Sequence, residues 1–336
     1  MRTLLSAIPP SSSPSSLARS WVLACDGMVV YDIQDESGRT NEPRPFPFRK
    51  TCDPSKYGSI LSKASGKQCV IYKSVVEHSV GSFDQWLGEC TATHNHHALN
   101  LVGAATSKVG HPGPTLADAA ERVVSHPGCD FGCVTIAERH IKKGNEHQNI
   151  MRKQKLGAQW FISQAVYDGA ATCKLITDYA DLCKAEGVKP RKIVLTFAPC
   201  GRKKTLTFIK WLGVKVPEDV EERIFSVDKE KTTCTDESVA ILNEILDMIL
   251  KATSTTGVPI GINVESVSIV REEIDGAHSL FQSLQRKTLD WHSYQQGKSL
   301  RWAIRWIQVD AEGGAASEGG ELAAPAAAPL QLGLAL

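Results

Sequence analysis

The amino-acid sequence predicts a single (β/α)8 barrel of the α/β class, and two features of the 336-residue chain carry that prediction. Short runs that are apolar at nearly every position alternate with longer amphipathic stretches, as expected for parallel strands buried on both faces. No internal segment is rich enough in Pro, Gly or Ser to mark a domain boundary. We therefore expect one barrel domain over residues 1–309.

The first expected strand is Leu4–Ile8, which Pro9 and Pro10 end. Residues 1–20 also contain serines and arginines but no acidic residue, a composition typical of an organellar transit peptide. We favour the strand, because the rest of the chain supplies only seven others and cleavage behind it would expose a sheet edge. A cytoplasmic protein is then expected. Plastid or mitochondrial import is the alternative.

The remaining strands and helices follow in regular alternation. The other expected strands are Met28–Ile33, Cys69–Val75, Ala98–Gly103, Phe131–Ile136, Trp160–Gln164, Ile193–Ala198 and Ile260–Val264. The expected helices include Leu116–Val124, Glu146–Leu156, Ala170–Ala185, Val239–Lys251 and Ile274–Leu289.

Two departures from the regular pattern are visible, and the chain ends in an unusual tail. The segment Ser11–Cys25 is short for a full first helix, and Arg202–Lys251 holds an extra helix before the last strand. Residues 310–336 are low-complexity sequence rich in Ala, Gly, Pro and Glu. Such sequence buries too little apolar surface to offset the entropy of ordering, so we expect a disordered tail.

Charge and apolar content exclude several classes of partner. The 38 Lys and Arg residues nearly balance the 37 Asp and Glu residues, so no net charge drives binding to nucleic acid or to an anionic membrane. The longest apolar stretch, Trp21–Tyr31, is interrupted by Asp26 and is shorter than the roughly 20 residues that cross a bilayer. The ten scattered cysteines are expected to be free thiols. A soluble protein with a small-molecule partner is expected, and a homo-oligomer is compatible with the sequence.

Barrel enzymes carry their chemistry on the loops that follow the strands, and position therefore selects the candidate residues. Those that follow strands are Asp32, Asp35, Glu36, Arg39, Lys73, Glu77, His78, Glu138, Arg139, His140, Gln164, Tyr167, Asp168 and Glu265. These charges could equally pair with one another on solvated loops. The histidines from His94 to His97 precede their strand, so surface histidines are favoured there over a metal site. There is no Walker loop and no GxGxxG after a strand.

At the fifth and sixth strands the chain resembles a known family. The segment FGCVTIAERH, followed by EHQNIMRKQKLGAQWFISQAVYD, resembles the catalytic barrel of the methylenetetrahydrofolate reductases. The likeness continues through PRKIVLTFAP and VPIGINVESVS and covers roughly residues 1–290. The box VVYDIQDESGRT resembles a divergent, reductase-like branch of that family.

The resemblance implies a cofactor, a reaction and a set of site residues. FAD would lie at the carboxyl ends of the strands, and NADH or NADPH would supply hydride to reduce methylenetetrahydrofolate to methyltetrahydrofolate in one-carbon metabolism and methionine biosynthesis. His140 and Lys153 would contact the flavin, and Ile162 would lie beside its isoalloxazine. Gln164 would hydrogen-bond the pterin, and Asp168, which matches the Asp of the family's FFD motif, would also bind the substrate.

The chain departs from the family where proton transfer is decided. The family has a glutamate as proton donor on the first strand, and this chain has Ser6 there, which cannot act as an acid near neutral pH. The catalytic acid is therefore unknown. The candidates at strand ends are Asp35, Glu36, Glu138 and Glu265. Three hypotheses stand: a flavin-dependent oxidoreductase that acts on methylenetetrahydrofolate or a related pterin, a non-catalytic folate- or pterin-binding barrel, and a flavin-free barrel enzyme.

Overall fold

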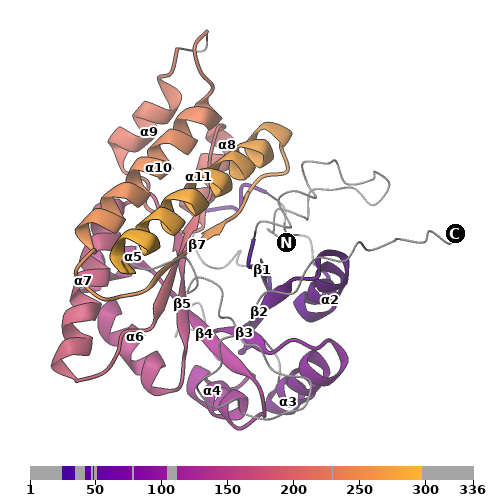
Figure 1. The fold of residues 1–336 in the computed structure, drawn as a ribbon. Helices are drawn as coiled ribbons and strands as arrows, with labels where there is room; N and C mark the ends of the chain where they lie inside the picture. Colours follow the sequence, from indigo (N-terminus) through magenta and orange to yellow (C-terminus); the bar gives the residue numbers. More distant parts are fainter. Residues whose placement is uncertain are drawn as a thin grey trace, which may run out of the picture. The chain divides into compact units, whose positions relative to one another are not determined.

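A computed structural model describes residues 25–34, 42–46, 48, 51–77, 79–103, 112–228 and 230–296. Seven parallel strands lie in the order in which they occur in the chain and form a nearly closed barrel (Figure 1). They are β1 (Gly27–Val30), β2 (Gln68–Ser74), β3 (Ala98–Val102), β4 (Asp130–Thr135), β5 (Trp160–Ala165), β6 (Lys192–Phe197) and β7 (Ile260–Val264). The predicted α/β barrel is confirmed.

The helices lie on the outer side of the strands, where Figure 1 shows them. They are α2 (Pro54–Ser65), α3 (Val80–Gly88), α4 (Leu116–Val124), α5 (Ala137–Lys143), α6 (Glu146–Lys155), α7 (Gly169–Ala185), α8 (Lys203–Trp211), α9 (Glu218–Phe225), α10 (Cys234–Ala252) and α11 (Arg271–Gln296), with a π-helical turn η2 (Glu89–Thr93) after α3. The extra helical material predicted before the last strand is confirmed, because α8, α9 and α10 all lie between β6 and β7.

The predicted strands match the observed ones to within a few residues, with the largest difference at β1. This strand ends at Val30 rather than at Ile33. The carboxylate of Asp32 accepts the backbone N–H of Ser74 at 2.9 Å and the side-chain amide of Gln34 at 2.8 Å. A side chain therefore completes the bonding at the end of β2, and β1 is not extended.

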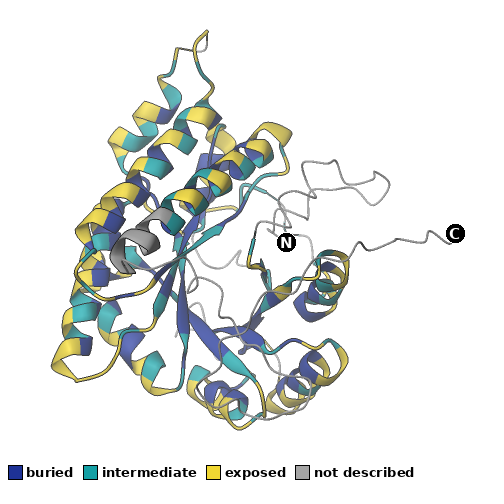
Figure 2. Cartoon of the chain, viewed as in Figure 1, coloured by how far each residue is buried: buried dark blue, intermediate teal, exposed yellow. Residues whose placement is uncertain are grey.

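In-register residues show which side chains face the barrel interior. Ile71 of β2 lies against Gly58 of α2, so this residue faces the helices. Its neighbour Tyr72 faces inward and pairs in register with Asn100 of β3, which in turn pairs with Gly132 of β4. Burial follows the same division, and Figure 2 shows buried strands and helices that are exposed on their outer faces.

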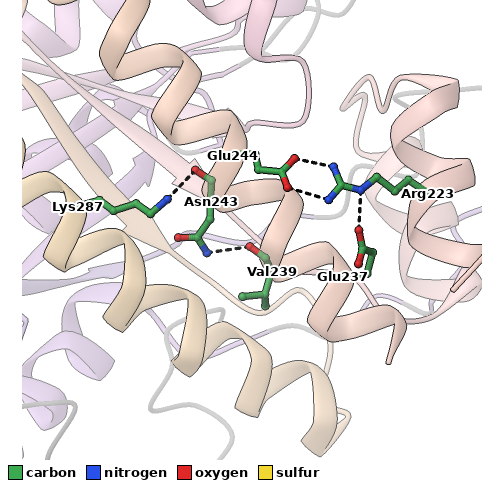
Figure 3. A network of polar contacts seen from close by, with 6 residues as sticks. All are labelled: Arg223, Glu237, Val239, Asn243, Glu244 and Lys287. Atoms are coloured by element: carbon green, nitrogen blue, oxygen red, sulfur yellow. Dashed lines mark hydrogen bonds and ion pairs between the residues drawn. The ribbon is translucent and has the colours of Figure 1, made fainter. Parts of the chain in front are cut away.

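The last three helices are tied together by charged side chains that meet on α10 (Figure 3). Arg223 of α9 donates two hydrogen bonds to Glu244, at 2.6 and 2.8 Å, and a third to Glu237 at 2.6 Å. Lys287 of α11 donates to the backbone carbonyl of Asn243 at 3.4 Å. Helix α10 is thereby fixed between its two neighbours.

Several predictions fall outside the described residues. These are the strand Leu4–Ile8, the shortened first helix in Ser11–Cys25, the tail 310–336, and the candidate residues Ser6, Asp35, Glu36, Arg39 and His78. All ten cysteines are free, as the sequence predicted. Within the described part of the chain, no helix is both long and apolar enough to cross a membrane.

Candidate functional site

A polar cluster joins the carboxyl ends of the first and last described strands. Asn263 of β7 donates from its amide to the Tyr31 hydroxyl at 3.0 Å and to the Thr196 hydroxyl at 3.2 Å. The ring centroids of Tyr31 and Tyr72 lie 4.5 Å apart. Glu265, directly after β7, is buried. We call these five residues the mouth cluster.

The mouth cluster combines neutral phenols with one carboxyl group. Burial raises the pKa of Tyr31 and of Tyr72 well above its usual value, and the nearby charge of Glu265 raises both further. Both tyrosines are therefore hydroxyl donors at neutral pH. Of the candidate acids that the structure describes, Glu265 is the one in this cluster.

A second group forms where β5 departs from regular pairing. The register shifts between Ile162 and Ala165, so that β5 has one more residue than β6 in this stretch. The Ser163 hydroxyl accepts the backbone N–H of Thr196 at 2.9 Å in place of a ladder bond. Such β-bulges re-aim the side chains beside them, and here the neighbour is Gln164.

The orientation of the Gln164 amide is fixed by the loop between α8 and α9. Its Nε2 donates to the carbonyl oxygen of Leu212 at 2.6 Å. Because a carbonyl oxygen only accepts hydrogen bonds, the amide nitrogen must face Leu212 and the amide oxygen must point elsewhere. That oxygen has no hydrogen-bond partner among the residues that the structure describes. Gln164 thus presents one oriented acceptor.

Glu138 stands beside Gln164 at the start of α5. One of its carboxylate oxygens accepts the backbone N–H of Lys215 at 3.3 Å. Burial raises the pKa of Glu138 above its usual value, and the charge of Asp168 adds to the rise. The site therefore holds a carboxyl group that is easier to protonate than a solvated one.

Asp168 has a largely architectural position in the same group. One carboxylate oxygen accepts the backbone N–H of Ala171 at 2.9 Å and so caps α7, and the other pairs with the ammonium group of Lys215 at 3.1 Å. Asp168 and Glu138 therefore both hold Lys215 and, through it, the loop that also binds Gln164.

Glu138, Gln164 and Asp168 line one narrow pocket. The space inside it that a water-sized group can enter is about 10 Å³, room for roughly one water molecule. Its rim is polar and its floor is apolar. The floor residues come from α7 and β6, and they are Leu175, Ile176, Ile193 and Leu195. We call this the Gln164 pocket. The floor residues belong to the buried core, so a ligand would meet only the polar rim.

The three residues that the resemblance assigns to the flavin do not lie together. Ile162 is buried on the inner wall of the barrel, in register with Val134 and Val194. Lys153 of α6 lies in the helix layer, where its ammonium group donates to the Val134 carbonyl at 2.6 Å, and burial lowers the pKa of Lys153. His140 is buried between helices, where its Nε2 contacts Asp178 at 2.8 Å.

Lys73 and the histidine run also take structural positions. Lys73 is buried, and its ammonium group lies 4.7 Å from the ring centroid of Trp86 on α3. His96 is buried at the amino end of β3, the end opposite the candidate site, and its Nε2 contacts the Ser55 carbonyl at 2.9 Å. Burial lowers the pKa of His96, so a neutral ring is favoured there.

Two buried carboxylates escaped the sequence analysis because they lie on helices rather than directly after strands. Glu146 of α6 accepts the backbone N–H of Ile136 at 3.3 Å and completes the bonding at the end of β4. Glu273 of α11 accepts from the backbone N–H groups of Gly201 and Arg202, at 2.8 and 3.1 Å, and from the Thr205 hydroxyl at 2.9 Å. An acidic residue in the first turn of a helix was the available signal, but it also occurs on solvated helices.

Glu273 occupies backbone N–H groups at the amino end of α8 that could otherwise bind an anionic ligand. Free backbone N–H groups at a helix start form a ready phosphate site. Here the chain's own carboxylate accepts those N–H groups, and it is fully buried. The amino end of α8 therefore offers these donors to Glu273 rather than to a cofactor phosphate.

Comparisons with known proteins find matches among solved structures. No protein-family model and no curated protein matches the sequence. Among solved structures, the chain is similar to an uncharacterized protein from Clostridium thermocellum that binds two copies of 5-methyl-5,6,7,8-tetrahydrofolic acid. The two share 29% sequence identity with a TM-score of 0.66, and the match covers 81% of this chain and 87% of that chain.

Proposed function

We propose that this chain binds a reduced folate at the carboxyl end of its barrel, with the pterin edge held at the rim of the Gln164 pocket. The observation that carries the proposal is the match over most of both chains to a structure described as binding 5-methyltetrahydrofolate. Folate as ligand was already implied by the resemblance of residues 131–168 to the reductase family, so two separate observations support the same ligand class.

The chemistry of the pocket rim supports a pterin. The pterin ring presents an amide-like N–H beside an exocyclic amino group, both of them donors. Gln164 presents an amide oxygen whose direction is fixed by Leu212, and Glu138 presents a carboxylate. Two acceptors on this rim match two donors at the edge of a flat ring. Asp168 positions Lys215 in this scheme and is not needed as a ligand contact.

The described residues fit a flavin less well. Of the three residues that the resemblance assigns to FAD, Ile162 alone lies on the inner wall of the barrel. His140 and Lys153 are bonded to other protein groups in the helix layer. FAD would supply hydride transfer where it is bound. A binding barrel is therefore the function that the geometry supports best.

Reduction of methylenetetrahydrofolate with NADH or NADPH is the second candidate, and Glu265 favours it. This carboxyl group is buried beside two tyrosines at the barrel mouth. In the sequence, the position that the resemblance assigns to the family's acid is Ser6. In this scheme Glu265 would hold the proton that the folate receives. The Glu265→Gln variant should then lose about 100- to 10,000-fold in rate while still binding folate. A colourless protein that oxidises neither nicotinamide in the presence of methylenetetrahydrofolate would remove this candidate.

The binding proposal is tested by titration calorimetry with 5-methyltetrahydrofolate. The unmodified chain should bind, and Gln164→Ala should weaken binding about 5- to 150-fold, the effect of losing one buried hydrogen-bond partner of roughly 1–3 kcal/mol. Gln148→Ala is the matched control, because Gln148 is exposed on α6, away from the pocket. Equal affinities for all three proteins would refute the placement of the pterin, and no binding by any of them would refute the proposal itself.

A further inference from the structure

Three side chains that commonly bind metal ions meet where α5, α6 and α7 pack together, apart from the pocket. His140 Nε2 lies 2.8 Å from an oxygen of Asp178, and the rings of His140 and His147 are 5.0 Å apart between centroids. One ligand atom from each of the three residues lies within 4.8 Å of the others. In the described part of the chain, no other group of three His, Cys, Asp or Glu side chains brings its ligand atoms this close together.

The polar atoms of this cluster are not all satisfied by the protein. His140 is 2% exposed, yet its Nδ1 has no hydrogen-bond partner in the described part of the chain. The Nδ1 of His147 is likewise buried without a partner there. A buried ring nitrogen without a partner is uncommon and calls for an explanation such as a bound ion. His140 contacts Asp178 through Nε2, so the partnerless atoms are the Nδ1 atoms of the two rings. Two rings that each keep a buried nitrogen without a partner, in a group with one carboxylate, favour a cation over a chance contact.

From this arrangement we infer that His140, His147 and Asp178 form a binding site for a divalent cation of the zinc class. Two imidazoles and one carboxylate are a ligand set that Zn²⁺ commonly takes, with a water molecule in the fourth position. His147 and Asp178 are half-buried, so solvent can reach that position. Soft thiolate ligands are absent from the set, and two nitrogens distinguish it from a Ca²⁺ or Mg²⁺ site.

The changes that binding requires are small. Zinc–nitrogen and zinc–oxygen distances of roughly 2 Å bring ligand atoms to within about 4 Å of one another, so the three groups must close by roughly 1 Å. Asp178 also pairs with Lys174 at 2.8 Å, but the Lys174 side chain is 59% exposed and can turn to water at little cost.

The cluster lies in a place where a bound ion would restrain the loop between α5 and α6. His140 is near the end of α5, His147 is at the start of α6, and Asp178 belongs to α7. Glu138, one of the pocket residues, lies in the first turn of helix α5. Metal binding should therefore raise the thermal stability of the chain and hold the helix that carries Glu138.

The site is tested with the full chain, freed of any histidine tag and treated with a chelator. Zn²⁺ binding is measured by calorimetry, and the site is identified by the visible absorption of Co²⁺ in a low-coordinate site. We expect one ion per chain and a thermal midpoint that rises with Zn²⁺ concentration. His147→Ala removes a half-buried ligand and should weaken binding about 100-fold or more. Asp178→Asn, which keeps the shape of the side chain, should weaken it as well.

The control is His94→Ala. His94 is half-buried in the other histidine-rich part of the chain, at the amino end of β3. This variant should bind Zn²⁺ as the unmodified chain does. The inference is overturned if the unmodified chain binds no ion, if His147→Ala binds as tightly as the unmodified chain, or if His94→Ala is the variant that loses binding.

Discussion

Gly132 is the single position in the barrel interior where one added methyl group should matter most. A Cβ atom at Gly132 would overlap the indole ring of Trp160, its partner in register on β5, and this ring is buried. A glycine is needed there because the indole fills the space that its side chain would take.

The Gly132→Ala variant should therefore be destabilised by about 1–3 kcal/mol, the usual cost of overpacking a core. Gly81→Ala is the control, because an added Cβ meets no atom on that exposed turn of α3 and alanine favours the helix. Denaturant unfolding of both variants tests this expectation. An unfolding free energy of Gly132→Ala equal to that of the unmodified chain would contradict the packing described here.

The raised pKa of Glu138 predicts a pH dependence of stability. Burial makes the folded chain hold this proton to a higher pH than the unfolded chain, so ionisation of Glu138 opposes folding. The resulting loss of stability begins as the pH rises through the pKa of Glu138 in the unfolded chain, about 4.3. It is complete once the pH exceeds the pKa of Glu138 in the folded chain. Glu138→Gln, which keeps the acceptor for Lys215, should match the unmodified chain at pH 4 and gain relative stability toward pH 7. The test is to measure the thermal midpoints of both proteins from pH 4 to pH 7. A variant that becomes less stable than the unmodified chain as the pH rises would be inconsistent with a raised pKa.

Sequence position predicted which residues follow strands but not where their side chains point. Gln164 and Glu138 reach the same pocket because a bulge and a helix start turn them there. His140 is only two residues beyond Glu138, yet it points into the helix layer toward Asp178. On a short helix such as α5, residues two positions apart face different directions, and the packing partners that select the face are remote in sequence.

At the level of elements, α8 depends on a side chain from α11. Glu273 accepts from two backbone N–H groups and one hydroxyl group at the amino end of α8. Glu273 and the Thr205 hydroxyl are buried, and the two bonds from backbone N–H groups are partly buried, so water can replace the lost partner only in part.

Glu273→Ala should cost at least about 1–3 kcal/mol of unfolding free energy, the penalty for one buried group left without a partner. Its neighbour Glu272 is exposed and accepts one hydrogen bond, from Thr235 at 3.0 Å, so Glu272→Ala should cost about 1 kcal/mol or less. Equal costs for the two variants, measured by denaturant unfolding, would show that the Glu273 contacts do not hold the helix.

Strand periodicity predicted all seven described strands, because parallel strands buried on both faces leave an unmistakable apolar run. Helix ends were harder. Helix α10 begins at Cys234, five residues before the expected Val239, because Thr233 caps it by accepting the backbone N–H of Asp236 at 3.1 Å. That first turn is polar, and an apolar pattern cannot detect it.

At the scale of the whole molecule, the prediction that Leu4–Ile8 forms a strand concerns the closure of the barrel. Among the described strands, β1 and β7 each pair with one neighbour, and Asn263 and Tyr31 bridge them by side chains. If Leu4–Ile8 is the eighth strand, deleting residues 1–10 should expose backbone donors and acceptors and cause aggregation. Deleting residues 310–336 should leave the unfolding midpoint unchanged. The two deletion variants are compared by size-exclusion chromatography and thermal unfolding. A stable monomer without residues 1–10, or a native chain that begins beyond Ser13, would favour the transit peptide instead.

The binding of a reduced folate, with its pterin at the rim of the Gln164 pocket, is tested most directly by a crystal structure of the full chain with 5-methyltetrahydrofolate. Such a structure locates the ring as well as detecting it. We expect the pterin to lie within hydrogen-bond distance of the Gln164 amide oxygen and the Glu138 carboxylate, with Gln164 still bonded to Leu212. A pterin bound elsewhere, or a pocket that stays empty at saturating folate, would contradict it.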